Sequence, residues 1–305
     1  MKKLFKPENI TVLAGLALAV FLLFSPTFIG VADNGDFLRM MNTIGLNYYD
    51  AAESYTDRFF GFSHSRFAYE NLFRGFYPSS QIFLVLLPRL VGGLFHGSYF
   101  DIRMLGAVYV ILLLAATWLL VKTHARSSYL TGLLLGGSLL FVFYDIGYLA
   151  YFNSLFGEPV SMVFMLLTFA LGLRLTGQEN PTVKGLTWFF IAVLFLTSSK
   201  IQNAPIGIAF ALIFLRFAAL KGQGNWRKVA LGFSVAMFLI SVILYVTAPK
   251  DLKHINLYQT VFYGILNESP DVRGDLQQLG LPERLEVLAG TNYFQQDTAI
   301  KQNDP

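Results

Sequence analysis

The sequence contains no cysteine, and charged residues make up only 14% of its 305 residues. Without cysteine, the chain can form no disulfide, no thiolate nucleophile and no thiolate metal site. Soluble globular proteins carry about one quarter charged residues, so this scarcity argues against a soluble domain. The four histidines show no spacing typical of a metal site or a catalytic triad. The sequence also lacks a glycine-rich phosphate loop, an HExxH motif and an internal repeat.

Apolar residues dominate the composition instead. Hydrophobic residues make up 54% of the chain, and its 30 Phe, 15 Tyr and 3 Trp suit membrane interfaces and grooves for lipid or sugar. The mean hydropathy is +0.52. The net charge of +4 comes from basic residues in short clusters between apolar runs, a pattern that does not indicate a nucleic-acid partner. We therefore predict an all-α, polytopic bundle of membrane helices within a lipid bilayer.

Long runs with little or no charge mark about seven candidate spans, because a bilayer core requires about 20 apolar residues. Three of the runs reach that length only if a flanking basic side chain extends toward water. One further run, 80–95, carries Pro88 and Arg89 at its middle and is ambiguous. The candidate spans are 9–32, 104–121, 127–144, 159–173, 185–199, 204–219 and 229–248.

The first of these runs is predicted to remain in the protein. It follows MKKLFK, which resembles the start of a signal peptide, but it exceeds the usual length of a signal-peptide core. It also ends in VADNGD rather than at a small-residue cleavage site. We interpret it as a retained first span.

Basic residues favour cytoplasmic loops, and this rule decides the role of 80–95. If 80–95 is an interfacial or re-entrant helix on the outer side, every basic cluster falls inside; if it crosses, several fall outside. We therefore predict seven spans in a bacterial cytoplasmic membrane, with the N-terminus inside and the C-terminus outside. The basic residues used are Lys2, Lys3, Lys6, Lys122, Arg126, Arg174, Lys184, Lys221, Arg227 and Lys228. The residues predicted to lie outside are Asp33, Asp36, Asp145, Glu158 and Lys200.

This topology divides the chain into four parts. Residues 1–31 hold the first span, and 32–101 form an outer loop that contains the interfacial helix. Residues 102–248 form a six-span bundle, and 249–305 form an outer polar segment. The last letters, KQNDP, close no recognisable element, so we expect the protein to continue past Pro305.

The segment DNGDFLRMMNTIGL follows the first span and holds the first candidate site. It predicts a short helix starting near Asn34, capped by Asp33 or Asn34, with Asp36 and Arg39 one turn apart. A carboxylate beside a guanidinium stays ionised and can accept a proton from a hydroxyl nucleophile. The alternative is a capped, charge-paired helix start without a catalytic role.

The segment YFNSLFGEP, 151–159, holds the second candidate. Glu158 precedes Pro159, which suits the first turn of a helix, and an acid there is also favoured by the helix dipole alone. Tyr148, Tyr151 and Asn153 nevertheless surround Glu158 with polar groups in an apolar region, as at the edge of a substrate site. Both interpretations remain open.

The segment TSSKIQNAP, 197–205, holds the third candidate. Lys200 and Gln202 interrupt two apolar runs on the predicted outer side, where the positive-inside rule would not place a lysine. An ammonium at the level of the lipid headgroups is a natural partner for a phosphate. The alternative is a solvated lysine in a tight turn before Pro205.

The order and sidedness of these motifs resemble the GT-C membrane glycosyltransferases. Within that superfamily, NGDF, YFNSLFGEP, TSSKIQN and the outer segment VFYGILNESPD…LGLPE…LAGTNYF are similar to the WsfD-type hexose transferases of S-layer and cell-surface glycan biosynthesis. An interfacial helix that opens on YPSS fits the same pattern. The resemblance extends over essentially all 305 residues.

The resemblance implies an enzyme that transfers a hexose from a polyprenyl-phosphate donor to a growing cell-envelope glycan on the outer face. By position, Asp36 corresponds to the catalytic loop acid and Glu158 to a second acid. We expect an inverting mechanism with Asp36 as the base, and Lys200 and Arg39 beside the phosphate. The further substrate-binding candidates are Asp33, Asn153 and Gln202. A Mg or Mn ion held by Asp33, Asp36 and Glu158 is an open possibility.

Two other classes of protein remain alternatives to a glycosyltransferase. A transporter or flippase of a glycolipid would carry its ionisable residues at mid-membrane, facing a cavity, whereas here they lie at the ends of the spans. A non-catalytic membrane scaffold or fragment would bind the lipid carrier without turnover. An O-antigen-ligase-like enzyme would need a basic outer loop for a diphosphate, which the sequence does not show.

Overall fold

The computed structural model describes residues 5–54, 57–95, 97–124, 128–219, 225–291 and 293, and of 60 and 250–253 the backbone alone. It is mostly helical with little strand, as expected for a polytopic helical membrane protein. The chain divides into two compact units, Met1–Tyr245 and Val246–Pro305. Lys2, Lys3, Arg126, Lys221 and the final KQNDP, which entered the sequence predictions, lie outside the described residues.

The first unit contains a set of long apolar helices connected by short segments. In chain order its elements are α1 (Pro7–Leu23), α2 (Phe37–Ile44), β1 (Leu46–Tyr48), the π-helix η1 (Asp57–Gly61), β2 (Arg66–Tyr69), α3 (Gln81–Phe95), β3 (Phe100–Asp101), α4 (Arg103–His124), α5 (Tyr129–Phe143), α6 (Ile146–Leu149), the 3₁₀ helix η2 (Ala150–Asn153), α7 (Glu158–Thr176), α8 (Val183–Ser198), the 3₁₀ helix η3 (Ile201–Asn203), α9 (Ile206–Ala218) and α10 (Trp226–Val246).

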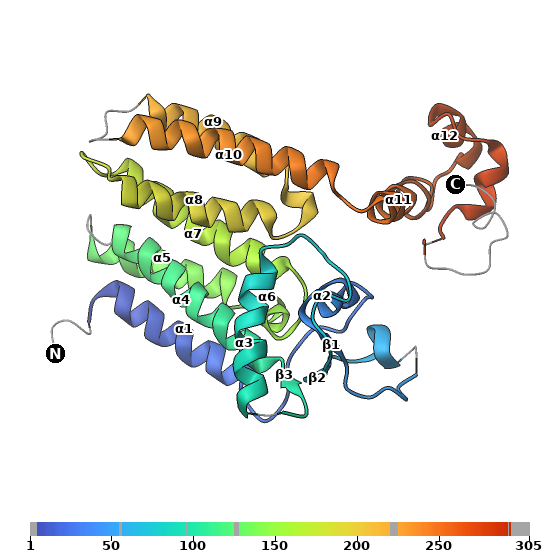
Figure 1. Ribbon diagram of the computed structural model, residues 1–305, viewed down its shortest axis with the longest axis horizontal. Helices are drawn as coiled ribbons and strands as arrows, with labels where there is room; N and C mark the ends of the chain where they lie inside the picture. Colours follow the sequence, from blue (N-terminus) through green and yellow to red (C-terminus); the bar gives the residue numbers. More distant parts are fainter. Residues whose placement is uncertain are drawn as a thin grey trace. The chain divides into compact units, whose positions relative to one another are not determined.

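Helices α1, α4, α5, α7, α8, α9 and α10 run along a common direction (Figure 1). The pairs α7–α8, α1–α4 and α4–α7 pack along much of their length. Among the described helices, four are long and apolar enough to cross a membrane: Arg103–His124, Glu158–Thr176, Ile201–Ala218 and Trp226–Val246. A fifth span is possible if α5 and Ile146–Asn153, bent by 59°, count as one, and α1 and α8 are shorter. The protein is therefore a multi-helix membrane protein.

The first helix is shorter than its apolar run predicts. The charge-free run extends from 9 to 32, but α1 ends at Leu23. Pro26 lacks a backbone N–H and disfavours the helical conformation of the residue before it, so the helix stops ahead of Ser25. Within the predicted first span, 1–31, the helix therefore ends at Leu23.

The connections gather at two ends of the long helices, and α3 does not run with them (Figure 1). The start of α1 and the α7–α8 connection lie at one end; α2, the strands, α6 and the α8–α9 connection lie at the other. Helix α3 crosses the second end at a steep angle to α4 and α7. The residues 81–95 thus form a helix that does not run alongside the long helices.

The segment 32–101 contains strands as well as helices, which corrects the prediction of an all-α protein. Strand β2 pairs antiparallel with both β1 and β3, and Leu46, Asn47 and Tyr48 face Tyr69, Ala68 and Phe67 in register. The strands have two to four residues each. Elements this short leave too little alternation in the sequence for a period of two to be recognised.

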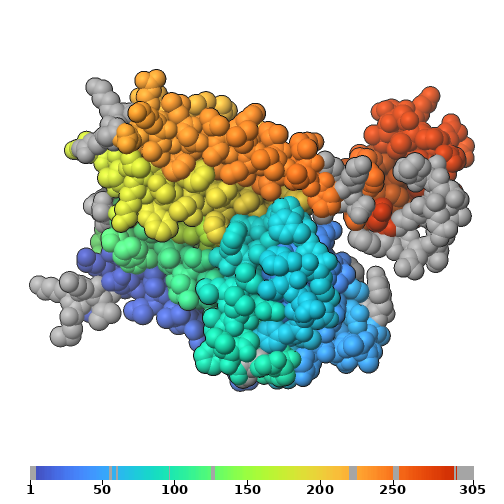
Figure 2. All heavy atoms as spheres, viewed as in Figure 1, coloured from blue at the N-terminus to red at the C-terminus, as the bar shows by residue number. Residues whose placement is uncertain are grey.

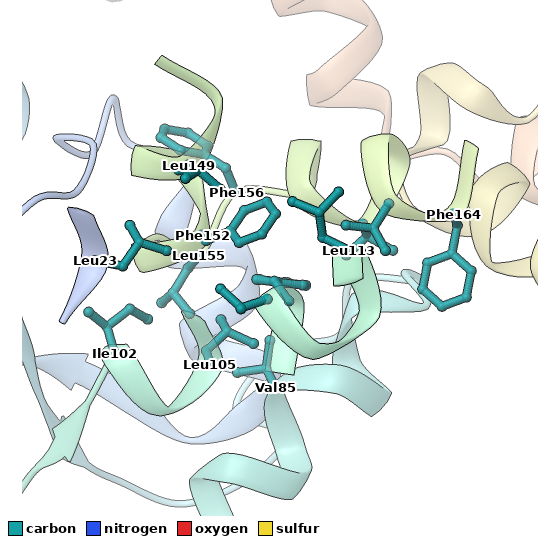
Figure 3. Packing of buried hydrophobic residues seen from close by; sticks show 14 of the residues in the cluster. Leu23, Val85, Ile102, Leu105, Leu113, Leu149, Phe152, Leu155, Phe156 and Phe164 are labelled. Atoms are coloured by element: carbon teal, nitrogen blue, oxygen red, sulfur yellow. The ribbon is translucent and has the colours of Figure 1, made fainter. Parts of the chain in front are cut away.

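One apolar core joins this loop to the helices. Leu23 of α1, Val85 of α3, Leu105 and Leu113 of α4 and Phe164 of α7 belong to one buried cluster, shown in Figure 3. Phe37 and Met41 of α2 and Phe67 of β2 belong to it too. Because the loop shares this core, α2 is held on the end of the helices rather than loosely attached.

The second unit has a small core of its own. It comprises α11 (Lys250–Tyr258), the π-helix η4 (Gln259–Ile265), α12 (Val272–Gln278) and the 3₁₀ helix η5 (Glu283–Leu288). The buried side chains of this core are Val261, Phe262, Leu266, Leu276 and Leu288. Although the segment is polar in sequence, these residues are sufficient to fold it into a compact cluster.

Candidate functional site

A pocket opens where α2, α7 and the α8–α9 connection meet. Its cavity volume is about 30 Å³, and about 410 Å³ when the open solvent at its mouth is included. Five of the seven residues predicted from the sequence as catalytic or substrate-binding line it, although they come from three separate stretches of the chain. The lining residues are Asp36, Arg39, Met40, Tyr77, Gln81, Leu155, Phe156, Gly157, Glu158, Ser199, Lys200 and Gln202.

Helix α2 forms one wall of the pocket. The Arg39 Nη1 lies 2.9 Å from Asp36 Oδ1, and 41% of the Asp36 side chain is exposed. The predicted pairing of Asp36 with Arg39 on one helical face is therefore confirmed. The helix begins at Phe37 rather than near Asn34, with Asp36 as its N-cap residue. This later start places Asp36 at the rim of the pocket.

Asp33 lies behind this wall and is fully buried. Its Oδ1 accepts hydrogen bonds from the backbone N–H groups of Gly35 and Phe37, at 2.7 and 3.1 Å, which satisfies the start of α2. The Tyr48 hydroxyl donates to its Oδ2. Burial raises the pKa of Asp33, although these hydrogen bonds act to lower it. Burial and the hydrogen bond to Asp33 raise the pKa of Tyr48. The structure thus gives Asp33 a capping role rather than a contact with the pocket.

The opposite wall is built by α7 and the end of α8. The Lys200 Nζ lies 2.6 Å from Glu158 Oε1, with 46% of the Glu158 side chain exposed. The stem of Lys200 passes close over Gly157, where a Cβ would lie 2.8 Å from Lys200 Cγ and 3.1 Å from the Ser199 carbonyl. Only a residue without a side chain at 157 permits this course of the lysine stem.

The segment before α3 connects the two walls. The Ser79 hydroxyl donates to the Ser199 carbonyl at 2.7 Å, and the Gln81 Nε2 donates to the carbonyls of Leu155 and Phe156 at 2.9 and 2.8 Å. The Tyr77 N–H donates to Thr43 Oγ1 of α2 at 3.0 Å. These contacts fix the distance between the walls, because one short segment contacts both of them.

Tyr77 and Gln81 were not among the residues predicted to line the site. Tyr77 lines the pocket, and burial raises the pKa of its phenol. A hydrogen bond from the backbone of Ile201 and the charges of Arg39 and Lys200 act against that rise. Its hydroxyl therefore keeps its proton at neutral pH. The YPSS pattern that opens α3 was the only available signal, and it indicated a helix start rather than a pocket wall.

Asn153 was predicted to bind substrate, and the structure gives it another partner. Its side chain is buried, and its Nδ2 donates to the carbonyls of Leu23 and Ile29 at 3.3 and 2.8 Å. These are carbonyls at and beyond the C-terminal end of α1, which the helix itself leaves unsatisfied. Asn153 therefore holds the end of α1 and does not line the pocket. Gln202, by contrast, does line it.

The pocket does not assemble the metal site that the sequence left open. Within the described residues, no group of three or more histidines and acids is placed to hold a metal ion. Asp33 is enclosed by its hydrogen-bond donors, so it cannot join Asp36 and Glu158 around one ion. What remains is two carboxylates and two cations in one small pocket. Such a site can take a proton from a hydroxyl and can hold a phosphate.

Comparison with known proteins gives one match. The family model described as the YfdI N-terminal transmembrane domain matches residues 1–305. No curated protein and no solved structure matches the chain.

Proposed function

Since the chain belongs to the family of the YfdI N-terminal transmembrane domain, we propose that it is a GT-C-like membrane glycosyltransferase. It transfers a hexose from a polyprenyl-phosphate donor to a hydroxyl of a growing cell-surface glycan. One observation carries the proposal: the ion pairs Asp36–Arg39 and Glu158–Lys200 lie in one pocket, at the end of helices suited to a membrane. A lipid-linked phosphate and a sugar hydroxyl both require such groups at the membrane surface.

The pocket can supply the parts of an inverting displacement. The acceptor oxygen forms a bond to the sugar's anomeric carbon while its proton passes to a carboxylate oxygen of Asp36. The bond from that carbon to the phosphate oxygen breaks, and its electron pair leaves with the polyprenyl phosphate. Lys200 and Arg39 stabilise the negative charge on this leaving group. When the phosphate takes Lys200 from Glu158, the freed Glu158 carboxylate can accept hydrogen bonds from sugar hydroxyls.

The direct test is Asp36→Asn. The amide keeps the size of the side chain but cannot take a proton, so turnover should fall by roughly 10²- to 10⁴-fold, the usual contribution of a positioned base. The measurement is release of polyprenyl phosphate from a polyprenyl-phosphate hexose in nanodiscs. Asp50→Asn, in an exposed acid of the same loop that does not line the pocket, is the matched control and should be unaffected.

Three results would count against the proposal. Wild-type turnover in Asp36→Asn removes the base assignment. Donor binding without turnover in the wild-type protein favours a scaffold or a lipid carrier, and transport of the intact glycolipid across the bilayer favours a flippase.

We further propose seven spans, with the pocket at the outer face and the N-terminus in the cytoplasm. The exposed residue Ala52 lies in the loop at the pocket end, and exposed Asn180 lies in the connection between α7 and α8. Because the native chain has no cysteine, Ala52→Cys and Asn180→Cys each carry a single thiol. A membrane-impermeant thiol reagent should label the first in intact cells and the second only after permeabilisation. The reverse pattern would invert the topology and place the pocket in the cytoplasm.

A further inference from the structure

Tyr77 is attached to both walls of the pocket. Its backbone N–H donates to Thr43 Oγ1 of α2 at 3.0 Å, and the Thr43 hydroxyl donates in turn to the Arg39 carbonyl at 2.9 Å. At the far end of the side chain, the phenolic oxygen accepts from the backbone N–H of Ile201, the residue that follows Lys200. The tyrosine therefore extends from the α2 wall to the Lys200 wall.

The chain after Tyr77 keeps it in this place. Pro78 disfavours the helical conformation of the residue before it, so Tyr77 stays outside α3, which begins only at Gln81. Ser79 and Gln81 then hydrogen-bond to carbonyls of the opposite wall, so the segment cannot rotate away from the pocket. Figure 2 shows the segment that leads into α3 (cyan to teal) at the surface of the first unit.

The Tyr77 hydroxyl has a proton to donate. Because its oxygen accepts from the Ile201 N–H, the O–H bond points in another direction, and among the described residues no group accepts a hydrogen bond from it. Burial raises the pKa of the phenol above its ordinary value of 10, so the group is protonated at neutral pH. The pocket thus offers a neutral donor in addition to its cations.

The charges that act on this hydroxyl are those of the proposed donor site. Arg39 and Lys200 lower the pKa of the phenol and Asp36 raises it, although burial outweighs all three. The same three residues line the pocket together with Tyr77. An anion that is held by the two cations therefore comes within reach of the tyrosine hydroxyl.

We infer that Tyr77 contacts the donor and that its hydroxyl donates a hydrogen bond to a phosphate oxygen, beside the charges of Lys200 and Arg39. The inference rests on the proposed function, which assigns a phosphate to this pocket. The proton stays on the phenol, because a phosphate monoester, with a second pKa of about 6, is far too weak a base to remove it.

This hydrogen bond should favour the leaving group over the bound donor. The phosphate of the donor is a diester with one negative charge, and it gains a second charge when its bond to the sugar breaks. A hydrogen bond strengthens with the charge of its acceptor. The Tyr77 hydroxyl therefore contributes more to the transition state than to binding of the donor, which raises kcat.

Tyr77→Phe tests the inference in the full protein in nanodiscs, because it removes the hydroxyl and keeps the ring. Two probes that require no knowledge of the hexose are titrated at about pH 7.5. Farnesyl phosphate is a monoester with a charge of about −2, and farnesyl methyl phosphate is a diester with a single negative charge. We expect Tyr77→Phe to bind the monoester about tenfold more weakly, as for loss of a hydrogen bond to a charged group, and to lose less affinity for the diester.

Two further variants calibrate the measurement. Tyr49→Phe is the matched control, because Tyr49 is an exposed tyrosine of the same loop that does not line the pocket. It should bind both probes as the wild type does. Lys200→Ala should bind both probes more weakly, since it removes a full charge. In the turnover assay, Tyr77→Phe should lower kcat by a larger factor than it raises KM.

Two results would overturn the inference and leave the proposed function standing. The first is wild-type affinity of Tyr77→Phe for farnesyl phosphate together with weakened binding by Lys200→Ala. The second is an equal loss for both probes in Tyr77→Phe, which would mean that the substitution disturbs the pocket as a whole. If the wild-type protein bound neither probe, the proposed phosphate site would be wrong, and this inference with it.

Discussion

The two walls of the pocket present the same pair of groups but are built differently. On the α2 wall, Asp36 and Arg39 lie three residues apart on one short helix. On the opposite wall, Glu158 and Lys200 are separated by 42 residues; Glu158 begins α7, and Lys200 lies in the connection between α8 and α9. The first pair depends on a helix of eight residues and its cap, and the second on the packing of α7 against α8.

This difference determines what a single substitution can disturb. A change at Asp33 or Tyr48 affects the start of α2 and therefore moves Asp36 and Arg39 together. A change near Lys200 leaves α7 and α8 packed and moves one side chain. Both ion pairs are partly exposed, so neither contributes much to folding stability. The ion pairs instead hold charged groups at the pocket. Substitutions in the two walls should therefore change turnover, by different amounts, more than they change stability.

After Asp36→Asn, the largest effect is expected on the Lys200 wall. Lys200→Ala should reduce turnover of the polyprenyl-phosphate donor by roughly 10²-fold, because removal of one charge-stabilising group in an active site has effects of this size. Lys200→Arg should recover part of the activity, since charge matters here more than shape. Thermal stability in detergent should stay near that of the wild type.

A matched control for this prediction is Lys184→Ala, an exposed lysine in the first turn of α8, at the other end of that helix. It should leave turnover unchanged. Full activity of Lys200→Gln would show that the ammonium is only a solvated charge in a turn, and the phosphate role would then be withdrawn.

A smaller effect is expected from Gly157→Ala on the same wall. The backbone at 157 has φ of −82°, which alanine adopts without strain, so the substitution acts mainly through the space its Cβ takes from the Lys200 stem, with the Ser199 carbonyl the other close neighbour. We expect turnover to fall about tenfold as the ammonium shifts. Gly137→Ala is the control, because a Cβ there meets nothing within 4 Å.

A double variant makes this second prediction specific. In a Lys200→Ala background, Gly157→Ala should have no further effect on turnover, since the side chain that it displaces is gone. Additive losses would mean that Gly157 acts on the pocket by another route.

The sequence could predict the parts that depend on local pattern. The charge-free runs indicated the long helices, and the spacing of Asp36 and Arg39 indicated their ion pair. No local pattern in the sequence indicated the contacts between distant segments. The sequence did not distinguish Asp33 from Asp36, although one is fully buried and the other is at the rim. Which of two acids three residues apart faces the pocket depends on where α2 starts and on Tyr48.

Because tertiary contacts leave no local signal in the sequence, the prediction that Asn153 binds substrate and the prediction of an all-α segment at 32–101 were both wrong. Asn153 stands among polar residues in sequence, but its amide is taken by carbonyls of a segment 124 and 130 residues away. The contact of Lys200 with Glu158 is likewise a product of α7–α8 packing, and the sequence showed only that both residues were unusual for their positions. The loop strands exist because three short segments pair with one another, which no single segment reveals.

The smallest effect is expected behind the α2 wall, as a dependence of stability on pH. Burial raises the folded-state pKa of Asp33 above its ordinary value of 3.8. A carboxyl with a raised folded pKa favours the folded state most below its unfolded pKa, near 4, and this contribution is lost as pH rises through the folded pKa. Asp33→Asn resembles the protonated acid and has no such dependence. Relative to Asp33→Asn, the wild type should therefore lose melting temperature as the pH rises above about 4.

The measurement is the difference in melting temperature between the two proteins in detergent, because groups common to both then cancel. Asp50→Asn is the control and should show no comparable trend, since Asp50 is exposed. Tyr48→Phe removes the hydroxyl that donates to Asp33, a hydrogen bond that lowers the Asp33 pKa. It should therefore move the loss of stability to higher pH. A difference that instead grows in favour of the wild type as pH rises would mean that the hydrogen bonds outweigh burial, and Asp33 would then be a charged cap.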